Sequence, residues 1–276
     1  MSKEKIKKIL DNFLSEMANA KKSRHTIVNY RSDLVHFLDN CSSGIENLTV
    51  ETLRSHLDGL SSKSPTTKAR HVSSLTSFLN WCYRKDYIPN NPILKIDCEK
   101  PVITHTPKKV EKNSIEKVIC SIEIFDKQNN VNINNLKYRL LFTLMKEAGL
   151  KVSEALHLNF EDIESETLTV LINSTPKRRV TLFSSDSVNL LELYKNEIRM
   201  SSGLIFKGGD AESKSLSYQA VNRFWRKCCQ KSGISITLQQ LRDCYARELI
   251  KKGFNIDVVS KILGHKKIQT TVKYFQ

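Results

Sequence analysis

Apolar side chains recur at every third or fourth position through the first hundred residues, which is the spacing of one helix face. Four short helices are therefore expected, with Thr26 and Thr49 as candidate N-caps and another helix after Pro65. Asn91-Pro92 should end this helical segment, because a residue before proline avoids the α region. The apolar positions behind this prediction are Tyr30, Leu34, Phe37, Leu38, Leu53, Leu57, Leu60, Val72, Leu75, Leu79 and Cys82.

The periodic pattern stops at residues 98–112, which contain Pro101, Pro107 and the pair Lys108-Lys109. This composition is typical of an extended, solvated linker. A basic linker could lie along DNA phosphates, although a short charge run is more often only solvated. We expect one domain at 1–97, a linker at 98–112 and a second domain at 113–276.

The second half of the chain predicts a mostly helical domain with one β-hairpin. Asn113 and Glu116 form a candidate capping box, and residues 168–172 and 179–183 alternate like two strands around a turn. Apolar spacing predicts helices around residues 115–122, 141–148, 190–198, 218–230, 238–252 and 257–263, the last two ended by Gly253 and Gly264.

The net charge of the chain indicates a candidate binding partner. Lys and Arg number 44 against 29 Asp and Glu, so the net charge of +15 favours polyanions, nucleic acid first, although such charges can simply solvate a surface. No apolar run is long enough for a membrane span or a signal peptide, so a cytoplasmic protein is expected. The cysteines form no C-x-x-C pair and are expected to be reduced: Cys41, Cys82, Cys98, Cys120, Cys228, Cys229 and Cys244.

Three residues near the C-terminus carry candidate chemistry. Arg242, His265 and Tyr274 are a cation, an imidazole and a phenol, the groups needed for metal-free phosphodiester exchange. A phenol can attack phosphorus only if its pKa is effectively lowered and fixed donors meet the developing charge. Taken singly, an arginine on an amphipathic helix is usually solvated and a histidine after a helix is usually structural. Their order and spacing carry the functional interpretation.

The run Leu-Gly-His-x-x-Ile-x-Thr-Thr-x-x-Tyr at 263–274 closely resembles the C-terminal signature of tyrosine recombinases, the phage integrase family. Residues 149–156, Gly-Leu-Lys-Val-Ser-Glu-Ala-Leu, resemble the first catalytic box of that family, and residues 26–34 resemble its core-binding domain. The resemblance implies a mainly α, two-domain architecture: a four-helix core-binding domain, then a mostly α catalytic domain with a small β-hairpin.

The resemblance also implies roles for individual residues. Tyr274 would attack the scissile phosphate to form a 3′-phosphotyrosyl intermediate and a free 5′-hydroxyl, while Arg242 and His265 would donate to the phosphoryl oxygens. Lys177 is the best candidate for the general acid of the hairpin, although Asn173 stands where some relatives would place that lysine. Arg178 and Arg179 would contact the DNA backbone. No cofactor is expected.

Three departures from the family pattern stand out. Lys151 replaces an arginine and loses its bidentate fork, and Gln239 replaces a histidine that acts as general base. The chain also ends two residues after Tyr274, where relatives continue into a helix that docks on a neighbouring subunit. We therefore expect slower cleavage and weaker or different assembly.

Two functions remain open at this stage. The first is a nucleoid-associated site-specific recombinase that integrates or recombines DNA of a mobile element, binding double-stranded DNA as a homotetramer on two sites with possible accessory proteins. The second is a catalytically impaired, recombinase-derived DNA-binding regulator or accessory factor. A topoisomerase-like nicking-closing enzyme is a third, weaker alternative. Trapping of a phosphotyrosyl adduct that is lost in Tyr274→Phe would indicate chemistry, whereas tight binding without an adduct would support the regulator.

Overall fold

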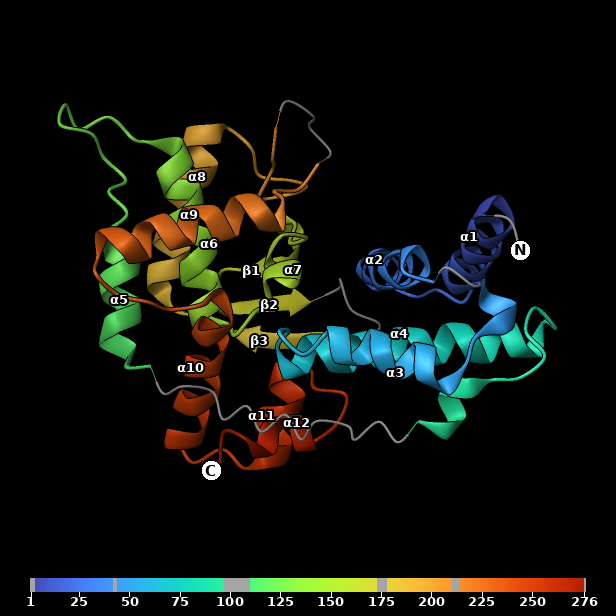
Figure 1. Ribbon diagram of the computed structural model, residues 1–276. Coiled ribbons are helices and arrows are strands. Elements are labelled where there is room, and N and C mark those ends of the chain that lie inside the picture. Colours follow the sequence, from blue (N-terminus) through green and yellow to red (C-terminus); the bar gives the residue numbers. More distant parts are fainter. Residues whose placement is uncertain (1–2, 42–43, 97–109, 173–177, 210–213, 276) are drawn as a thin grey trace. The chain divides into compact units, whose positions relative to one another are not determined.

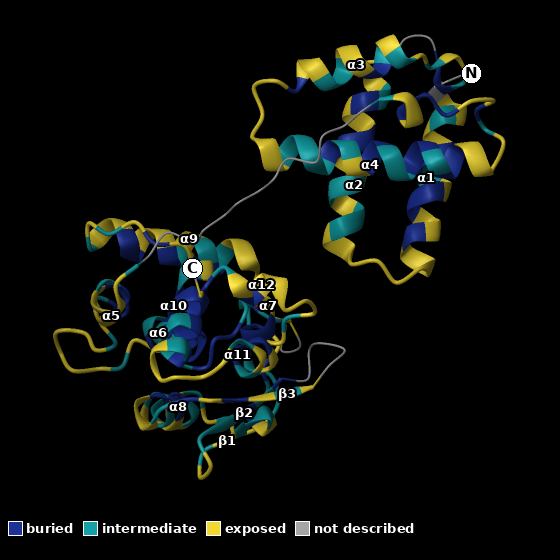
Figure 2. Cartoon of the chain, turned by 90° about the horizontal axis from the view of Figure 1, so that it is seen from below, coloured by how far each residue is buried: buried dark blue, intermediate teal, exposed yellow. Residues whose placement is uncertain are grey.

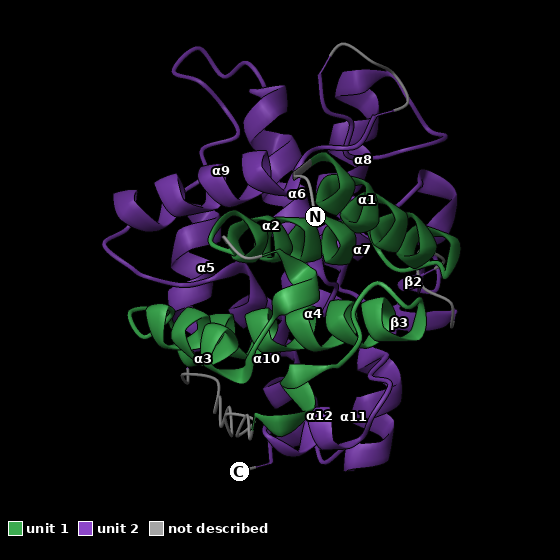
Figure 3. Ribbon diagram, turned by 45° about the vertical axis from the view of Figure 1, so that its right-hand side comes forward, with its two compact units in different colours: residues 1–104 green, residues 105–276 purple. Residues whose placement is uncertain are grey.

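The computed structural model describes residues 3–41, 44–96, 110–172, 178–209 and 214–275. The chain forms two compact units, Met1–Thr104 and His105–Gln276 (Figure 3). The fold is mainly helical with one small sheet, which confirms the predicted fold class. The predicted linker at 98–112 falls largely on residues 97–109, outside the described residues, and Lys112 already belongs to a helix.

Unit 1 contains the four helices that the apolar spacing predicts (Figure 1). Their buried faces form one core, which includes Leu34, Leu53 and Phe78. The N-cap prediction at Thr49 is confirmed, because its hydroxyl accepts from the Thr52 N–H. The elements are α1 (Lys3–Asn19), α2 (Arg24–Asp39), α3 (Val50–Gly59) and α4 (Pro65–Arg84), with 3₁₀ turns at Ile45–Asn47 and Pro92–Lys95.

Two other cap predictions are wrong. Ser23, not Thr26, caps α2, and its hydroxyl accepts from the Thr26 N–H at 3.1 Å, so Thr26 lies in the first turn. The capping box expected at Asn113 does not form, because the helix already begins at Lys112 and its cap position falls on Glu111, two residues before Asn113. Both errors shift a helix start along the chain without changing which face is buried.

Unit 2 surrounds a central helix and carries a three-stranded sheet. Its elements are α5 (Lys112–Cys120), α6 (Ile133–Glu147), α7 (Val152–Ala155), β1 (Ile163–Glu164), β2 (Thr169–Ile172), β3 (Arg179–Leu182), α8 (Ser185–Ile198), α9 (Tyr218–Lys231), α10 (Leu238–Lys251), α11 (Ile256–Leu263) and α12 (Gln269–Val272), with a 3₁₀ turn at Phe160–Asp162. Six consecutive residues of α6, 140–145, are buried, which identifies it as the core helix of this unit.

The sheet has the strand order β1-β2-β3 with both pairs antiparallel. The predicted hairpin is confirmed as β2 and β3, with Ile172 opposite Arg179, while the two-residue strand β1 was not predicted. Val170 and Ile172 on β2 face the core, as the alternation requires. The turn at 173–177 lies outside the described residues.

Helix α10 packs against both α6 and α11, and most of it is coloured as buried in Figure 2. The stripe predicted from sequence is buried in two places: Leu238 and Leu241 lie in the main core of unit 2, and Tyr245 and Leu249 pack with Val259 and Leu263 of α11. Helix α11 ends at Gly264, whose positive φ of 66° gives the left-handed cap that glycine tolerates best. The turn after it brings residues 265–274 back beside α11. Within the described residues, no helix has the length and apolar content of a membrane span.

Candidate active site

Helix α10 carries two adjacent charged side chains into the interior of unit 2. Its start is fixed by Gln240, whose side-chain oxygen accepts from the Thr237 N–H at 2.7 Å. Arg242 and Asp243 are only 2% and 3% exposed, although charged residues are almost never this buried unless they are paired. Their partners therefore define the site.

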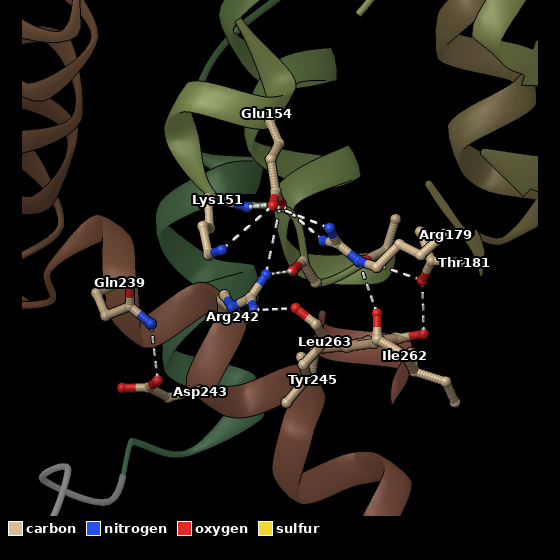
Figure 4. A network of polar contacts seen from close by, with 12 residues as sticks. Lys151, Glu154, Arg179, Thr181, Gln239, Arg242, Asp243, Tyr245, Ile262 and Leu263 are labelled. Atoms are coloured by element: carbon tan, nitrogen blue, oxygen red, sulfur yellow. Dashed lines mark hydrogen bonds and ion pairs between the residues drawn. The ribbon is translucent and has the colours of Figure 1, made fainter. Parts of the chain in front are cut away.

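Glu154 is the centre of the first set of partners (Figure 4). Its carboxylate accepts from both terminal nitrogens of Arg179, at 2.9 and 2.7 Å, and from the Lys151 N–H at 2.8 Å. Arg242 Nη1 lies 3.5 Å from the same carboxylate. Burial alone would raise the pKa of Glu154, but hydrogen bonds from Arg179 and the Lys151 backbone outweigh burial and lower it. Glu154 is therefore ionised and offsets two buried guanidinium charges.

Lys151 supplies the exposed cation of this cluster. It occupies the N-cap position of the short helix α7, and its ammonium lies 3.4 Å from Glu154 Oε1. Its side chain is 43% exposed, whereas that of Arg179 is 7% exposed. A phosphate arriving from solvent would meet Lys151 first.

Arg242 joins two turns that lie far apart in the sequence. Nη1 donates to the Gly149 carbonyl at 2.7 Å, and Nη2 donates to the Leu263 carbonyl. Arg179 Nε donates to the neighbouring Ile262 carbonyl at 2.8 Å. Both arginines therefore hold the end of α11, and with it the segment that carries His265.

His265 is half-buried directly after the left-handed Gly264. Its backbone N–H donates to the Ser260 carbonyl, and its ring nitrogen Nδ1 lies 2.8 Å from the Thr271 hydroxyl. Burial, together with the positive charges of Arg242 and Lys151, lowers the pKa of His265 to about 4. The imidazole is neutral at physiological pH, so it can serve as a hydrogen-bond donor without carrying charge.

Tyr274 is 7% exposed, and its ring packs beside the His265 ring with the centroids 6.3 Å apart. Its hydroxyl is buried but has a polar partner, because Oη donates to Asp243 Oδ1 at 2.6 Å. Burial and this hydrogen bond raise the pKa of Tyr274. The structure therefore does not itself lower the pKa of Tyr274, because the carboxylate stabilises the protonated phenol.

The remaining predicted site residues have different positions. Gln239 is exposed and donates from Nε2 to Asp243 Oδ1 at 3.0 Å, so it contacts the phenol's partner, not the phenol (Figure 4). Lys177 and Asn173 lie outside the described residues. Arg179 does not point outward to DNA as expected, because Glu154 and Ile262 bind its guanidinium.

Sequence reasoning missed Glu154 and Asp243 as members of the site, and it gave Arg179 a different role. Glu154 stands three residues after Lys151, the capping-box spacing, and that signal could have found it. No local signal marks the other two, since their partners come from distant segments. Among the described residues, no cluster of histidine, cysteine and carboxylate side chains is suited to a metal ion.

Comparison with known proteins gives consistent matches. Residues 112–276 match the phage integrase family, and residues 10–86 match the N-terminal SAM-like domain of phage integrases. The chain is 25% identical to the tyrosine recombinase XerC of Myxococcus xanthus, over 97% of this chain and 92% of the relative.

Solved structures share the fold at lower identity. A lambda integrase dimer bound to a COC′ core site is similar with a TM-score of 0.76 and 18% identity, over 98% of this chain and 94% of that one. The XerH site-specific recombinase in a post-cleavage complex with its palindromic difH substrate is similar with a TM-score of 0.74 and 19% identity. The match covers 90% of this chain and 75% of the XerH chain.

Proposed function

Because the chain belongs to the phage integrase family, we propose that it is a site-specific DNA recombinase working through a 3′-phosphotyrosyl intermediate. The observation that carries this proposal is the convergence of Tyr274, His265 and Arg242 at the end of α11, beside Lys151. These four residues supply one nucleophile and three donors to the non-bridging phosphoryl oxygens.

In the proposed reaction, Tyr274 Oη bonds to phosphorus while the bond from phosphorus to the 5′-oxygen breaks. Arg242, His265 and Lys151 stabilise the negative charge that builds on the phosphoryl oxygens, the interaction that usually contributes most to catalysis. The leaving 5′-oxygen takes a proton from a general acid, for which Lys177 stays the candidate. The phosphate ester energy is kept in the tyrosyl link, so the 5′-hydroxyl of another strand can attack in reverse.

The partner of His265 supports its role as a donor. If the Thr271 hydroxyl donates to Nδ1, the neutral ring carries its proton on Nε2 and presents that N–H to the phosphate. Thr271 is fully buried, which fixes this orientation of the ring. The low pKa of His265 then ensures that the ring is neutral before DNA binds.

DNA binding must open this site. Tyr274 and Arg242 are almost fully buried, and carbonyl groups already occupy donors of Arg242. We infer that the segment 265–275 shifts when the scissile phosphate arrives, because the short helix α12 is its single regular element. Lys151, already exposed, makes the first contact.

The proposed partner is double-stranded DNA, bound by both units. Unit 1 takes the place of the core-binding domain and unit 2 that of the catalytic domain, with the boundary in 98–112. The similar lambda integrase is a dimer on its core site, and we extend this to a homotetramer on two sites. The net charge of +15 favours DNA of any sequence and leaves specificity to base contacts.

A suicide substrate tests the proposal. Duplexes that bind the chain are first selected from a random-sequence library, then nicked close to the cleavage position so that the short strand diffuses away after cutting. We expect a protein–DNA adduct on a denaturing gel with the wild-type chain and none with Tyr274→Phe. Tight binding without any adduct from the wild-type chain would overturn the proposal.

A further inference from the structure

Asp243 is the one carboxylate in contact with the nucleophile among the described residues. Tyr274 Oη donates to its Oδ1 at 2.6 Å, a short distance typical of a hydroxyl donating to an ionised carboxylate. Gln239 Nε2 donates to the same oxygen at 3.0 Å from one helical turn earlier. Asp243 itself is 3% exposed, so water does not compete for this oxygen.

Positively charged groups surround the phenol that Asp243 contacts. Arg242 and Arg247 on α10 act on the Tyr274 hydroxyl, and the Lys273 ammonium lies 4.7 Å from the centre of the Tyr274 ring. His265 faces the same ring and is neutral. Three cations, Arg242, Arg247 and Lys273, therefore surround the phenol that contacts Asp243.

We propose that Asp243 is the catalytic proton acceptor for Tyr274, held in place by Gln239; this inference rests on the proposed recombinase function. Asp243 removes the need for a base at position 239, where the side chain is an amide that cannot accept a proton from the phenol. Gln239 instead orients the acceptor oxygen through its amide N–H.

Each proton that moves in the cleavage step is returned in the reverse step. As the bond between Tyr274 Oη and phosphorus forms, the phenolic oxygen loses basicity and its proton passes to Asp243 Oδ1. The 5′-oxygen leaves with a proton from the general acid. In the reverse step the incoming 5′-hydroxyl returns a proton to that acid, and Asp243 returns its proton to the departing phenol.

A different interpretation of the same contact makes the opposite prediction. A carboxylate that only restrains the phenol would slow attack, since the hydrogen bond must break before Oη reaches phosphorus. Removing that carboxylate would then accelerate cleavage. Asp243→Asn keeps the shape of the side chain and removes its ability to accept a proton, so it separates the two interpretations.

The experiment measures single-turnover formation of the covalent adduct on the nicked duplex. We expect Asp243→Asn to slow adduct formation about 100- to 10,000-fold near neutral pH, the range for a lost general base, with unchanged DNA affinity. Asp243→Glu should recover part of the rate. Asp186→Asn, on the exposed first turn of α8, is the matched control and should leave the rate unchanged.

The pH profile distinguishes proton transfer from simple misplacement of Tyr274. Without Asp243, the base must be solvent hydroxide, so the rate of Asp243→Asn should rise about tenfold per pH unit, whereas the wild-type rate stays flatter. Equal rates, faster cleavage by Asp243→Asn, or parallel pH profiles would each overturn the inference and leave the proposed function standing. Absence of any adduct with the wild-type chain would overturn both.

Discussion

At the residue scale, Lys151 is the site residue whose substitution is most expected to raise the rate of cleavage. A lysine gives the phosphate one point charge, whereas an arginine gives two parallel N–H donors in a fixed plane. The Lys151 side chain is 43% exposed beside Glu154, so a guanidinium has room there. We expect Lys151→Arg to accelerate adduct formation on the nicked duplex by about tenfold or more, since one oxyanion donor contributes on the order of a hundredfold.

The matched control for this change is Lys195→Arg on α8, where the ammonium pairs with Glu192 on the surface. It should leave the adduct rate unchanged. A slower rate in Lys151→Arg, with normal DNA affinity, would mean that the site depends on the lysine itself.

Glu154 matters for stability as well as for the site, because it is the anion between two buried guanidinium groups. Glu154→Gln keeps the shape but leaves Arg179 and Arg242 without their counter-charge. Breaking a buried ion pair from one side costs about 3–5 kcal/mol, so urea unfolding should show a loss of that size. The exposed Glu166→Gln should cost less than about 0.5 kcal/mol, and an equally small loss in Glu154→Gln would contradict the prediction.

The sequence predicted the site residues whose spacing is local. His265 and Tyr274 lie within one short segment, and the Gly264 cap between α11 and His265 follows from a single glycine. Asp243 and Arg179 could not be found this way, because their function depends on partners 31 and 25 positions away. A pairing of this kind becomes visible only when the chain has folded.

At the element scale, the turn between α6 and α7 fixes the distance to α10. Gly149 has a φ of 61°, and a Cβ built there would lie 2.3 Å from Tyr245 Cδ1. Its carbonyl accepts from Arg242. We expect Gly149→Ala to cost about 2–5 kcal/mol in urea unfolding, from left-handed strain and the clash together, and to remove adduct formation.

Gly233→Ala is the control that separates these two causes. Gly233 also has a positive φ, 66°, but nothing lies within 4 Å of its Cβ position. Strain alone should cost about 1–2 kcal/mol there. Similar losses in both variants would show that contact with Tyr245 is unimportant.

A pH effect is expected at the junction of α2 and α3 in unit 1. Burial, and then the charges of His36 and His71, lower the pKa of His56 from 6.5 to about 4. The unfolded chain therefore binds more protons than the folded chain between these values, so stability falls as the pH is lowered from 6.5 towards 4. Urea unfolding at several pH values should show this loss, and His56→Leu should reduce it.

His25→Leu serves as the control for that series, because His25 is exposed on α2. Its pH dependence should match that of the wild-type chain. An unchanged pH dependence in His56→Leu would show that His56 titrates normally and that its burial has no energetic consequence.

Secondary structure was predictable where one physical signal dominated. The apolar stripe of α10 and the alternation in β2 both appear in the structure as expected. Helix starts were less predictable, since Ser23 and Thr26 are both good caps three residues apart and either could begin the helix from sequence alone. Strand β1 has two residues, too few for any periodic signal, and exists because β2 pairs with it.

At the scale of the whole molecule, both units match parts of the same family, at residues 10–86 and 112–276. If both units bind the duplex, as proposed, the second contact forms at high effective concentration and adds affinity. Non-specific affinity then depends chiefly on phosphates and specificity on a smaller set of base contacts. Changes at the catalytic residues should therefore alter cleavage far more than binding.

The net charge of +15 leads to a quantitative prediction for binding. If both units contact the duplex, about 6–10 phosphates lose their counterions, and the logarithm of the association constant should fall with the logarithm of salt concentration with a slope of about −5 to −9. Fluorescence anisotropy with Tyr274→Phe measures this without cleavage. Because counterion release is independent of sequence, a selected duplex and a random duplex should differ in affinity but little in slope. A slope near zero would mean that the basic surplus faces solvent and that DNA is held by a few uncharged contacts.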